Sequence, residues 1–504
     1  MEPLNIAHFF LDARIEEGRG DRVALHTSGG RWTYREVQAL ANRYANVLSA
    51  AGVAPEQRVI IALPDGPDYV AALFGILKIG AVVVMVNPEL KPDAIAYFFD
   101  YSRATAALVA HDRADAFQAA AGQAAHPPTL HRVGSRAFSE RLEAASTVWR
   151  NYSTHPDDPA IWLFSGGTTG RPKAAVQPHR SYRNTAECYA RHVLAYTQED
   201  VTLSVPKLYF GYAMGSNLFF PFAAGASSVL FEDRCTAEVV FQRIAEFRPT
   251  MLITVPTMVN QMVSHPSAAA QDLGCLRLAT SAGEGLPEEL HERWDRAFGV
   301  PLLDGLGTAE QWHIFLSNRI GRIRRGTLGE VVPGFEIRVM DEEGREVPDG
   351  TMGHLWVRGG SRALGYWQHL DKSQACFRGE WVVTGDLVSR NADGYYTYGG
   401  RADELLKVQG KWLSAVEVEG CLLQHPAVAQ AAVVGVTDAN GLMKPHAYVV
   451  ARERRESLAE ELKSFARERL DAYKCPREVI FVDSLPTTHL GKVDRGRLRS
   501  GLPS

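Results

Sequence analysis

The sequence predicts an α/β protein: a large N-terminal domain of parallel-rich sheets with covering helices, plus a small mobile C-terminal α+β domain. Continuous apolar runs such as Val59–Leu63 alternate with helical segments over about the first 400 residues. Such runs are typical of strands buried on both faces, and their alternation with helices indicates parallel sheets. Near residue 400 the composition changes, and enough chain remains for a small domain. We therefore expect an N-terminal domain over 1–402 and a C-terminal domain over 403–504.

The elements of the large domain can be followed in order. The apolar stretch Tyr69–Val86 approaches the length of a membrane span, but Lys78 and Gly80 divide it. We expect a helix that ends near Gly80 and then a buried strand, followed by a helix after Pro92. Further strands are expected at 106–110 and in the runs SSVLFE, TMLITVP and LRLATSAGE.

The C-terminal domain has a pattern of its own. Strands are expected in VAQAAVVGV and HAYVVA, and SLAEELKSFARERL has the spacing of an amphipathic helix. We place the hinge between the two domains at Asp403.

Composition excludes several classes of function. The chain contains 54 Lys and Arg against 58 Asp and Glu, a formal net charge of −4, so neither nucleic acid nor an anionic membrane is an expected partner. Its 6 cysteines include no CxxC pair, which argues against a zinc site and a disulfide framework. The N-terminus carries early acids and no basic start before an apolar run, so we expect no secretory signal and a cytoplasmic location.

The strongest local signal is a loop suited to a polyphosphate. The apolar run Ile161–Phe164 leads into SGGTTGRPKA, in which glycines let backbone N–H groups face an anion and Lys173 adds a positive charge. The spacing differs from that of P-loop NTPases, because Pro172 disfavours a helix that begins at Lys173. A flexible surface linker is the alternative interpretation.

This loop resembles the signature loop of the adenylate-forming superfamily, which contains acyl-CoA synthetases, luciferases and peptide-synthetase adenylation domains. Further motifs of that superfamily follow in the same order: SAGEGLP from Ser281, DGLGTAE from Asp304, TGD from Thr384, GGRADELLKVQGKWLSAVEVE from Gly399 and LPTTHLGKVDR from Leu485. The resemblance implies an enzyme that activates a carboxylate with ATP and Mg²⁺ as an acyl-AMP. Transfer to the thiol of coenzyme A would then follow.

The resemblance also implies roles for individual residues around the nucleotide. Glu310 would coordinate Mg²⁺, and Thr168 and Lys173 would act on the phosphates. Asp386 would accept hydrogen bonds from the ribose hydroxyls, and Arg401 would reach ribose and phosphate. Considered alone, Glu310 has the alternative of a solvated loop acid, and Asp386 and Arg401 that of turn residues. The implied nucleotide-binding and coenzyme-binding positions are Ser165, Gly166, Gly167, Thr168, Thr169, Gly170, Lys173, Gly283, Glu284, Asp304, Gly305, Leu306, Gly307, Thr308, Asp386, Arg401 and Gly410.

Three positions near the C-terminus are implied to act through a domain movement. Lys492 resembles the lysine that joins the substrate carboxylate to the α-phosphate in the first half-reaction. Asp403 resembles the hinge residue, and Gly410 would line the tunnel for the pantetheine arm. A lone lysine near a C-terminus is ordinarily solvated, so the role of Lys492 depends on the motif.

The segment 206–220, PKLYFGYAMGSNLFF, occupies the position of the acid pocket in this superfamily. It contains no acidic residue, which disfavours an amino acid substrate because a desolvated ammonium group needs a partner. KLYFGYAMG and HIFLSN, at 313–318, are similar to benzoate-type aryl-CoA ligases, which implies a flat slot for one aromatic ring. A channel for a fatty chain stays open as an alternative, as does core packing for any single aromatic. The expected lining is Tyr209, Phe210, Gly211, Tyr212, Ala282, Gly307, Trp312, His313, Ile314 and Lys492.

Four departures from the family patterns refine these expectations. Gly211 stands where benzoate ligases have alanine, and Trp312 where they have an aliphatic residue. The missing methyl leaves room for a small ring substituent, so we expect 2-aminobenzoate as the acid, with benzoate next. Ala309 replaces a threonine and Ala174 a glycine; the lost hydroxyl at 309 costs about 1 to 3 kcal/mol unless Thr308 compensates.

Two other functions remain as alternatives. One is the same adenylation followed by loading of a carrier protein in place of coenzyme A. The other is a non-catalytic protein that binds a nucleotide or an aryl acid, although the retained Lys173, Glu310 and Lys492 argue against it. A homodimer is compatible with either.

Overall fold

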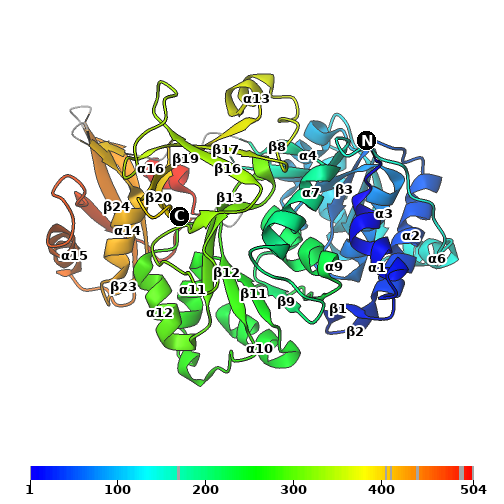
Figure 1. Ribbon diagram of the computed structural model, residues 1–504, viewed down its shortest axis with the longest axis horizontal. Helices are drawn as coiled ribbons and strands as arrows, with labels where there is room; N and C mark the ends of the chain where they lie inside the picture. Colours follow the sequence, from blue (N-terminus) through cyan, green and yellow to red (C-terminus); the bar gives the residue numbers. More distant parts are fainter. Residues whose placement is uncertain are drawn as a thin grey trace.

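The structure is a computed structural model that describes residues 2–166, 171–402, 406–408, 411–438, 442–486 and 493–501. Figure 1 shows a large N-terminal part, coloured from blue to yellow, and a smaller C-terminal part in orange and red at one side of it. This is the predicted fold class. The domain boundary at 402/403 stays a prediction, because residues 403–405 lie outside the described residues.

One sheet of the large domain contains the first predicted crossover units. Its order is β6-β5-β3-β4-β7-β8, in which every neighbouring pair is parallel except β7 and β8. Helix α3 ends at Ile79, where Gly80 takes the left-handed conformation, with φ 82°. The predicted helix end near Gly80 and the predicted strand at 106–110 are therefore confirmed. The elements are α2 (Tyr34–Ala50), β3 (Arg58–Ala62), α3 (Pro67–Ile79), β4 (Val82–Met85), α4 (Pro92–Ser102), β5 (Ala106–Ala110), α5 (Ala114–Ala121), β6 (Thr129–Val133), α6 (Arg136–Ala144), β7 (Pro159–Ser165) and β8 (Lys173–Pro178).

A second sheet has the order β15-β14-β13-β12-β11-β9-β10-β1-β2. Its central pairs are parallel, whereas β13 turns back antiparallel onto β14. Helices α10, α11 and α12 gather around its strands at the bottom of Figure 1. The elements are β1 (Val23–Thr27), β2 (Gly30–Thr33), β9 (Val201–Ser204), β10 (Ser227–Val229), α10 (Ala237–Phe247), β11 (Met251–Thr254), α11 (Pro256–Val263), β12 (Leu278–Ser281), α12 (Glu288–Phe298), β13 (Leu302–Gly307), β14 (Ile314–Ser317) and β15 (Glu330–Val331).

Short helices connect these sheets. They are η1 (His8–Asp12), α1 (Ala13–Glu16), η2 (His111–Arg113), α7 (His179–Thr185), η3 (Ala186–Arg191), α8 (Gly211–Met214), η4 (Gly215–Phe219), α9 (Phe220–Ala224), η5 (Ala268–Ala270), η6 (Ala309–Gln311) and α13 (Leu370–Cys376). In the described part of the chain, no helix is both long enough and apolar enough to cross a membrane.

The last sheet of the large domain is antiparallel and was not predicted from the sequence. It comprises β16 (Phe335–Met340), β17 (Gly353–Gly359), β18 (Phe377–Arg378), β19 (Trp381–Arg390) and β20 (Tyr396–Arg401). Its strands mix buried and exposed positions, as in the pattern of β16, and so lack the continuous apolar runs that identified the parallel strands.

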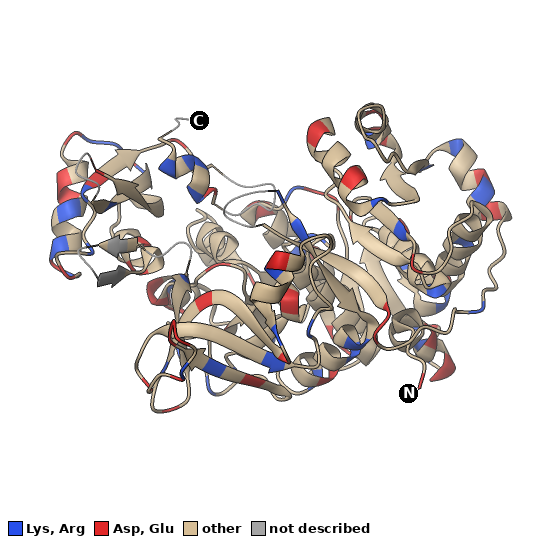
Figure 2. Ribbon diagram, turned by 90° about the horizontal axis from the view of Figure 1, so that it is seen from above, with Lys and Arg blue, Asp and Glu red and all other residues tan. Residues whose placement is uncertain are grey.

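The C-terminal domain has its own core and its predicted elements. Helix α15 (Leu458–Arg467) buries Leu458, Leu462 and Ala466 on one face, which confirms the amphipathic prediction. Asn260 on α11 donates to the carbonyl of Ala429 at 3.1 Å, so this domain contacts the second sheet's helices. Acidic and basic residues are interspersed over both domains in Figure 2. The elements are β21 (Leu406–Val408), β22 (Lys411–Leu413), α14 (Ala415–Leu423), β23 (Val428–Thr437), β24 (Met443–Ala451), α15, β25 (Glu478–Phe481) and α16 (Arg495–Arg499).

Candidate active site

The predicted phosphate loop joins two paired strands. Ser165 at the end of β7 lies opposite Lys173 at the start of β8, so the loop leaves and re-enters the sheet at one point. Gly166 is exposed, whereas the hydroxyl of Ser165 is buried and has no hydrogen-bond partner among the described residues. An unsatisfied buried hydroxyl at this point is suited to a ligand that accepts hydrogen bonds.

Several predicted site residues cannot be placed, because they lie outside the described residues. They are Gly167, Thr168, Thr169 and Gly170 of the loop, the hinge residue Asp403, the tunnel residue Gly410 and the catalytic Lys492. Their roles stay predictions from the motifs.

One tyrosine contacts both Lys173 and Glu310. The hydroxyl of Tyr366 donates to Oε1 of Glu310 at 2.6 Å, and Nζ of Lys173 lies 3.8 Å from the centroid of the Tyr366 ring. Burial lowers the pKa of Lys173, and Glu310 opposes that shift. Burial and the Glu310 carboxylate raise the pKa of Tyr366, which keeps its hydroxyl a donor.

The backbone around Glu310 is held from two directions. Gln177 on β8 donates its side-chain amide to the carbonyl of Ala309 at 2.6 Å, and Ala363 donates its N–H to the carbonyl of Glu310 at 2.8 Å. The hydroxyl of Thr308, one position earlier, is buried and unpaired in the described part of the chain. This turn therefore presents one carboxylate and one free hydroxyl.

Two glycines on β13, the strand that leads to this turn, lie where there is no room for a side chain. A Cβ at Gly307 would lie 2.4 Å from the carbonyl oxygen of His313, and one at Gly305 would lie 2.7 Å from that of Leu316. Asp304 is buried, and burial raises the pKa of its carboxyl group well above the usual value. Leu306 is half-buried on the same strand, where it lies opposite Leu316.

Asp386 and Arg401 form the predicted ribose-binding pair. They lie opposite each other on β19 and β20, with Nη1 of Arg401 3.6 Å from Oδ1 of Asp386. The hydroxyl of Tyr398 donates to the same carboxylate oxygen at 3.3 Å. Burial raises the pKa of Asp386, Arg401 lowers it, and Glu310 raises it further, so both carboxylates share one electrostatic environment.

The predicted adenine-side segment follows β12. Gly283 has φ 88°, a left-handed conformation that favours glycine, while Ala282 is buried. The carboxylate of Glu284 accepts hydrogen bonds from the backbone N–H of Thr257 at 3.2 Å and from its hydroxyl at 2.7 Å. These hydrogen bonds tie the side chain of Glu284 to the start of α11.

The predicted ring slot is built around His313. Its Nε2 donates to the carbonyl of Tyr212 at 3.1 Å, and its Nδ1 is buried with no partner among the described residues. Burial lowers the pKa of His313 to about 4, so the ring is neutral at physiological pH. The hydroxyl of Tyr212 lies 2.7 Å from that of Thr280. A Cβ at Gly211 would meet the side chain of Leu163 on β7 at 3.3 Å.

The remaining predicted slot residues are placed beside it. Trp312, with φ 61°, packs on the ring of Tyr182 at 4.3 Å, and its indole N–H is buried without a partner in the described chain. Ile314 is buried on β14. Tyr209 and Phe210 contact each other at 4.5 Å, and burial with the nearby Asp65 raises the pKa of Tyr209 to about 12.

A single magnesium carboxylate fits this chain. Within the described ranges, no group of three His, Cys, Asp or Glu side chains could enclose a metal ion. Mg²⁺ on a nucleotide is commonly held by one or two carboxylates together with phosphate oxygens. The buried carboxylate of Glu310, which interacts electrostatically with Lys173, is suited to be one such ligand.

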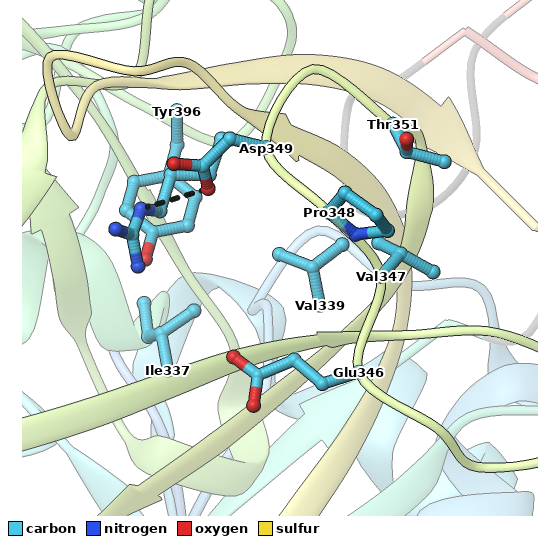
Figure 3. Close-up of a pocket in the computed structure, with 9 residues that line it drawn as sticks. Ile337, Val339, Glu346, Val347, Pro348, Asp349, Thr351 and Tyr396 are labelled. Carbon is cyan, nitrogen blue, oxygen red and sulfur yellow. Dashed lines mark ion pairs between the residues drawn. The ribbon is translucent and has the colours of Figure 1, made fainter.

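Sequence reasoning missed Tyr366, Tyr398 and Gln177. No sequence motif predicted a role for any of these three residues. Each of them nevertheless forms a hydrogen bond with a residue that lies in a motif. A small pocket partly lined by Ile337 and Val339 of β16, with the ion pair of Arg390 and Asp349 at 3.3 Å, contains none of the predicted site residues (Figure 3).

Known enzyme families match most of this chain. Residues 11–367 match the family described as AMP-binding enzyme, and residues 417–492 match its C-terminal domain. The chain belongs to the AMP-binding enzyme family. This membership confirms the resemblance predicted from the motifs.

Individual members of the family align along nearly the whole chain. A benzoate–CoA ligase of Thauera aromatica is 38% identical over 99% of this chain and 96% of its own length. The structure of an anthranilate–CoA ligase in complex with anthranoyl-AMP has a TM-score of 0.95, with 35% identity over 100% of this chain and 98% of that one. A benzoate–CoA ligase structure from Burkholderia xenovorans has a TM-score of 0.91, with 40% identity over 98% and 99% of the two chains.

Proposed function

We propose that this protein is an AMP-forming aryl-acid–CoA ligase. The acid oxygen attacks the α-phosphorus of ATP and pyrophosphate leaves, giving an aryl-AMP. The thiol of coenzyme A then attacks the carbonyl carbon, AMP leaves, and the thiol proton passes to solvent. Glu310 would hold Mg²⁺, and the bound ion would neutralise charge on the phosphates.

One observation carries this proposal: the turn from Gly307 to His313 joins the two halves of the site. Glu310 in its middle lies beside Tyr366 and Lys173, at the phosphate end. His313 at its end lies beside Tyr212, at the ring end. A carboxylate attached to an aromatic ring in the slot would therefore face the nucleotide phosphates.

The chemistry of the slot supports a small aromatic acid. The described side chains expected to line it are aromatic or apolar apart from His313, which is neutral, so the lining itself contains no carboxylate to pair with an ammonium group. The named activities of the aligned relatives, on benzoate and anthranilate, are of the same class.

Within that class we favour 2-aminobenzoate, with benzoate next. Gly211 lacks the methyl group of an alanine, which would lie 3.3 Å from the side chain of Leu163 and narrow the slot there. The unpaired Nδ1 of His313 is an acceptor in the same region, which suits an amino substituent. Saturation kinetics on both acids test this; a kcat/KM for benzoate about tenfold above that for 2-aminobenzoate contradicts it.

The acceptor and the moving parts belong to the same proposal. We assign the first half-reaction to Lys492, the hinge to Asp403 and the thiol tunnel to Gly410, in a domain over 403–504. Replacing Lys492 by alanine should remove acid-dependent ATP–pyrophosphate exchange, because the carboxylate and the α-phosphate would repel each other. Undiminished exchange would contradict the assignment.

The wider experiment is ATP–pyrophosphate exchange across benzoates, aminobenzoates, hydroxybenzoates, cinnamates and fatty acids. We expect exchange with the small benzoates. Supplying free coenzyme A and following the thioester by mass then distinguishes a CoA ligase from an enzyme that loads a carrier protein. Binding of ATP and acid without exchange would indicate a non-catalytic protein.

A further inference from the structure

Tyr366 touches both predicted phosphate-end groups, and no motif predicted a role for it. Its hydroxyl donates to Glu310 at 2.6 Å, while its ring lies 3.8 Å from Nζ of Lys173. Among the ion pairs within 4.0 Å in the described part of the chain, none joins Lys173 to Glu310, although the two groups attract each other electrostatically. The ring of Tyr366 therefore contacts the lysine and its hydroxyl contacts the glutamate, in place of a direct ion pair between the two charges.

The backbone around Tyr366 explains why it can hold both groups. Val176 on β8 donates to the carbonyl of Gly365 at 2.9 Å, and Trp367 donates to the carbonyl of Ala174 at 3.0 Å. This pairing fixes Tyr366 against the strand that begins with Lys173. Ala363, three residues earlier, donates to the carbonyl of Glu310 at 2.8 Å.

Two residues of the following helix, α13, also contact Tyr366. The N–H of Tyr366 donates to the hydroxyl of Ser373 at 2.9 Å, and the sulfur of Cys376 lies 3.4 Å from the Tyr366 hydroxyl. Tyr366 is buried. Its position is therefore determined by packing on several sides, which is what a group that orients others requires.

We infer that Tyr366 is a positioning residue: it orients Glu310 for the metal and holds Lys173 apart from Glu310, so that both charges remain available to a magnesium–triphosphate. An ion pair between the two would have to be broken on each binding event. A hydroxyl bonded to one carboxylate oxygen instead orients the carboxylate toward the metal, as outer-shell partners of metal ligands do. A cation held over a ring face is more weakly bound than one in an ion pair, and it can move to a phosphate.

This inference rests on the proposed function, but its test does not require the acid. ATP binding to the full-length protein is measured by calorimetry while Mg²⁺ is varied, without acid or coenzyme A. In Tyr366→Phe, the Mg²⁺ concentration for half-maximal binding should rise about 10-fold to 100-fold, the usual cost of losing an outer-shell partner. Tyr366→Leu, which also removes the ring, should lose more.

A matched control is available elsewhere in the chain. The hydroxyl of the buried Tyr44 donates to Oδ1 of the exposed Asp68 at 2.7 Å, so Tyr44→Phe also removes a tyrosine–carboxylate hydrogen bond. That variant should keep the wild-type Mg²⁺ dependence. The affinity for AMP, which lacks the β- and γ-phosphates, is measured for each variant as well. An unchanged AMP affinity indicates that the fold and the pair of Asp386 and Arg401 are intact.

Two results would overturn the inference. One is an Mg²⁺ dependence of Tyr366→Phe equal to that of the wild type. The other is a parallel loss of AMP affinity, which would mean that Tyr366 has a general structural role. If the exchange experiment fails for every aryl acid while the Mg²⁺ shift is observed, the proposed substrate is wrong and the role of Tyr366 stands.

Discussion

The phosphate end and the ring end of the site are built by different physical means. At the phosphate end, Lys173 and Glu310 are charged, and hydrogen bonds from Tyr366 and Ala363 hold the glutamate. At the ring end, His313 is neutral, and shape is set by packing between Gly211 and Leu163. A charged hydrogen bond depends on the exact position of its donor and acceptor, so few substitutions preserve it. A packed slot depends mainly on side-chain volume, so a substitution there changes which ligand fits.

Substitutions at the two ends should therefore have different effects on catalysis. A change at the phosphate end should alter the rate for every acid, because all acids share the nucleotide step. A change at the ring end should alter the ratio between acids and leave the nucleotide step intact.

The largest effect is expected for Glu310→Gln. The amide keeps the size of the side chain but removes the charge that binds Mg²⁺, so exchange should fall about 10² to 10³-fold with every acid. The measurement is acid-dependent ATP–pyrophosphate exchange. Glu336→Gln, in an exposed pair with Arg358, is the matched control. Exchange within about twofold of the wild type would remove the catalytic role from Glu310.

A smaller loss is expected for Thr308→Val. The buried, unpaired hydroxyl of Thr308 is the candidate replacement for the threonine missing at Ala309. Its removal should cost about 1 to 3 kcal/mol of transition-state stabilisation, seen as a lower kcat for all acids alike. Ala309→Thr added to the same chain should restore the rate. If Thr308→Val matches the wild type, another group must serve the α-phosphate.

At the ring end, Gly211→Ala should change selectivity. The added methyl would lie 3.3 Å from Leu163, so the slot narrows beside the ring. We expect the ratio of kcat/KM for 2-aminobenzoate over benzoate to fall about tenfold, with the KM for ATP unchanged. Gly122→Ala, on the surface, serves as the control. An equal loss for both acids would show that Gly211 serves the fold and does not select the acid.

The smallest effect is expected in the pH dependence of stability. His313 has a folded pKa of about 4 against an ordinary value of 6.5, so between these values the unfolded chain binds more protons. Stability should therefore be complete above pH 6.5 and decline as the pH falls toward 4. In His313→Asn the drop in melting temperature from pH 7 to pH 5 should shrink by about 2 °C. His179, whose pKa burial lowers to about 3, continues to contribute in that variant. An unchanged drop would mean that His313 is protonated in the folded protein.

Much of the parallel framework was predictable, because its signals are local. Val59–Leu63 and the 106–110 run are continuously apolar, and both form buried strands. Gly80 ends α3 through a left-handed conformation that its neighbours could not adopt without strain. The antiparallel sheet from β16 to β20 escaped prediction, since its half-exposed strands carry no such run.

The site was predictable only where motifs mark it. Glu310, Asp386 and Arg401 were identified by their position in ordered motifs, and the structure brings the last two within 3.6 Å. Tyr398 was missed although it bonds Asp386, because a tyrosine in a strand usually serves packing. The environment of His313, and hence its neutral state, depends on four surrounding aromatic rings that only the fold assembles.

The family and the class of reaction could be predicted from sequence motifs, and the same motifs predict which charged residues bind the nucleotide, because glycine-rich loops and apolar runs act through their immediate neighbours. The contact that links two of these charged residues is seen only in the folded chain. Tyr366 meets Glu310 across 56 positions of chain and meets Lys173 across the pairing of its segment with β8. Contacts of that kind arise from packing between distant segments, and no local pattern specifies them.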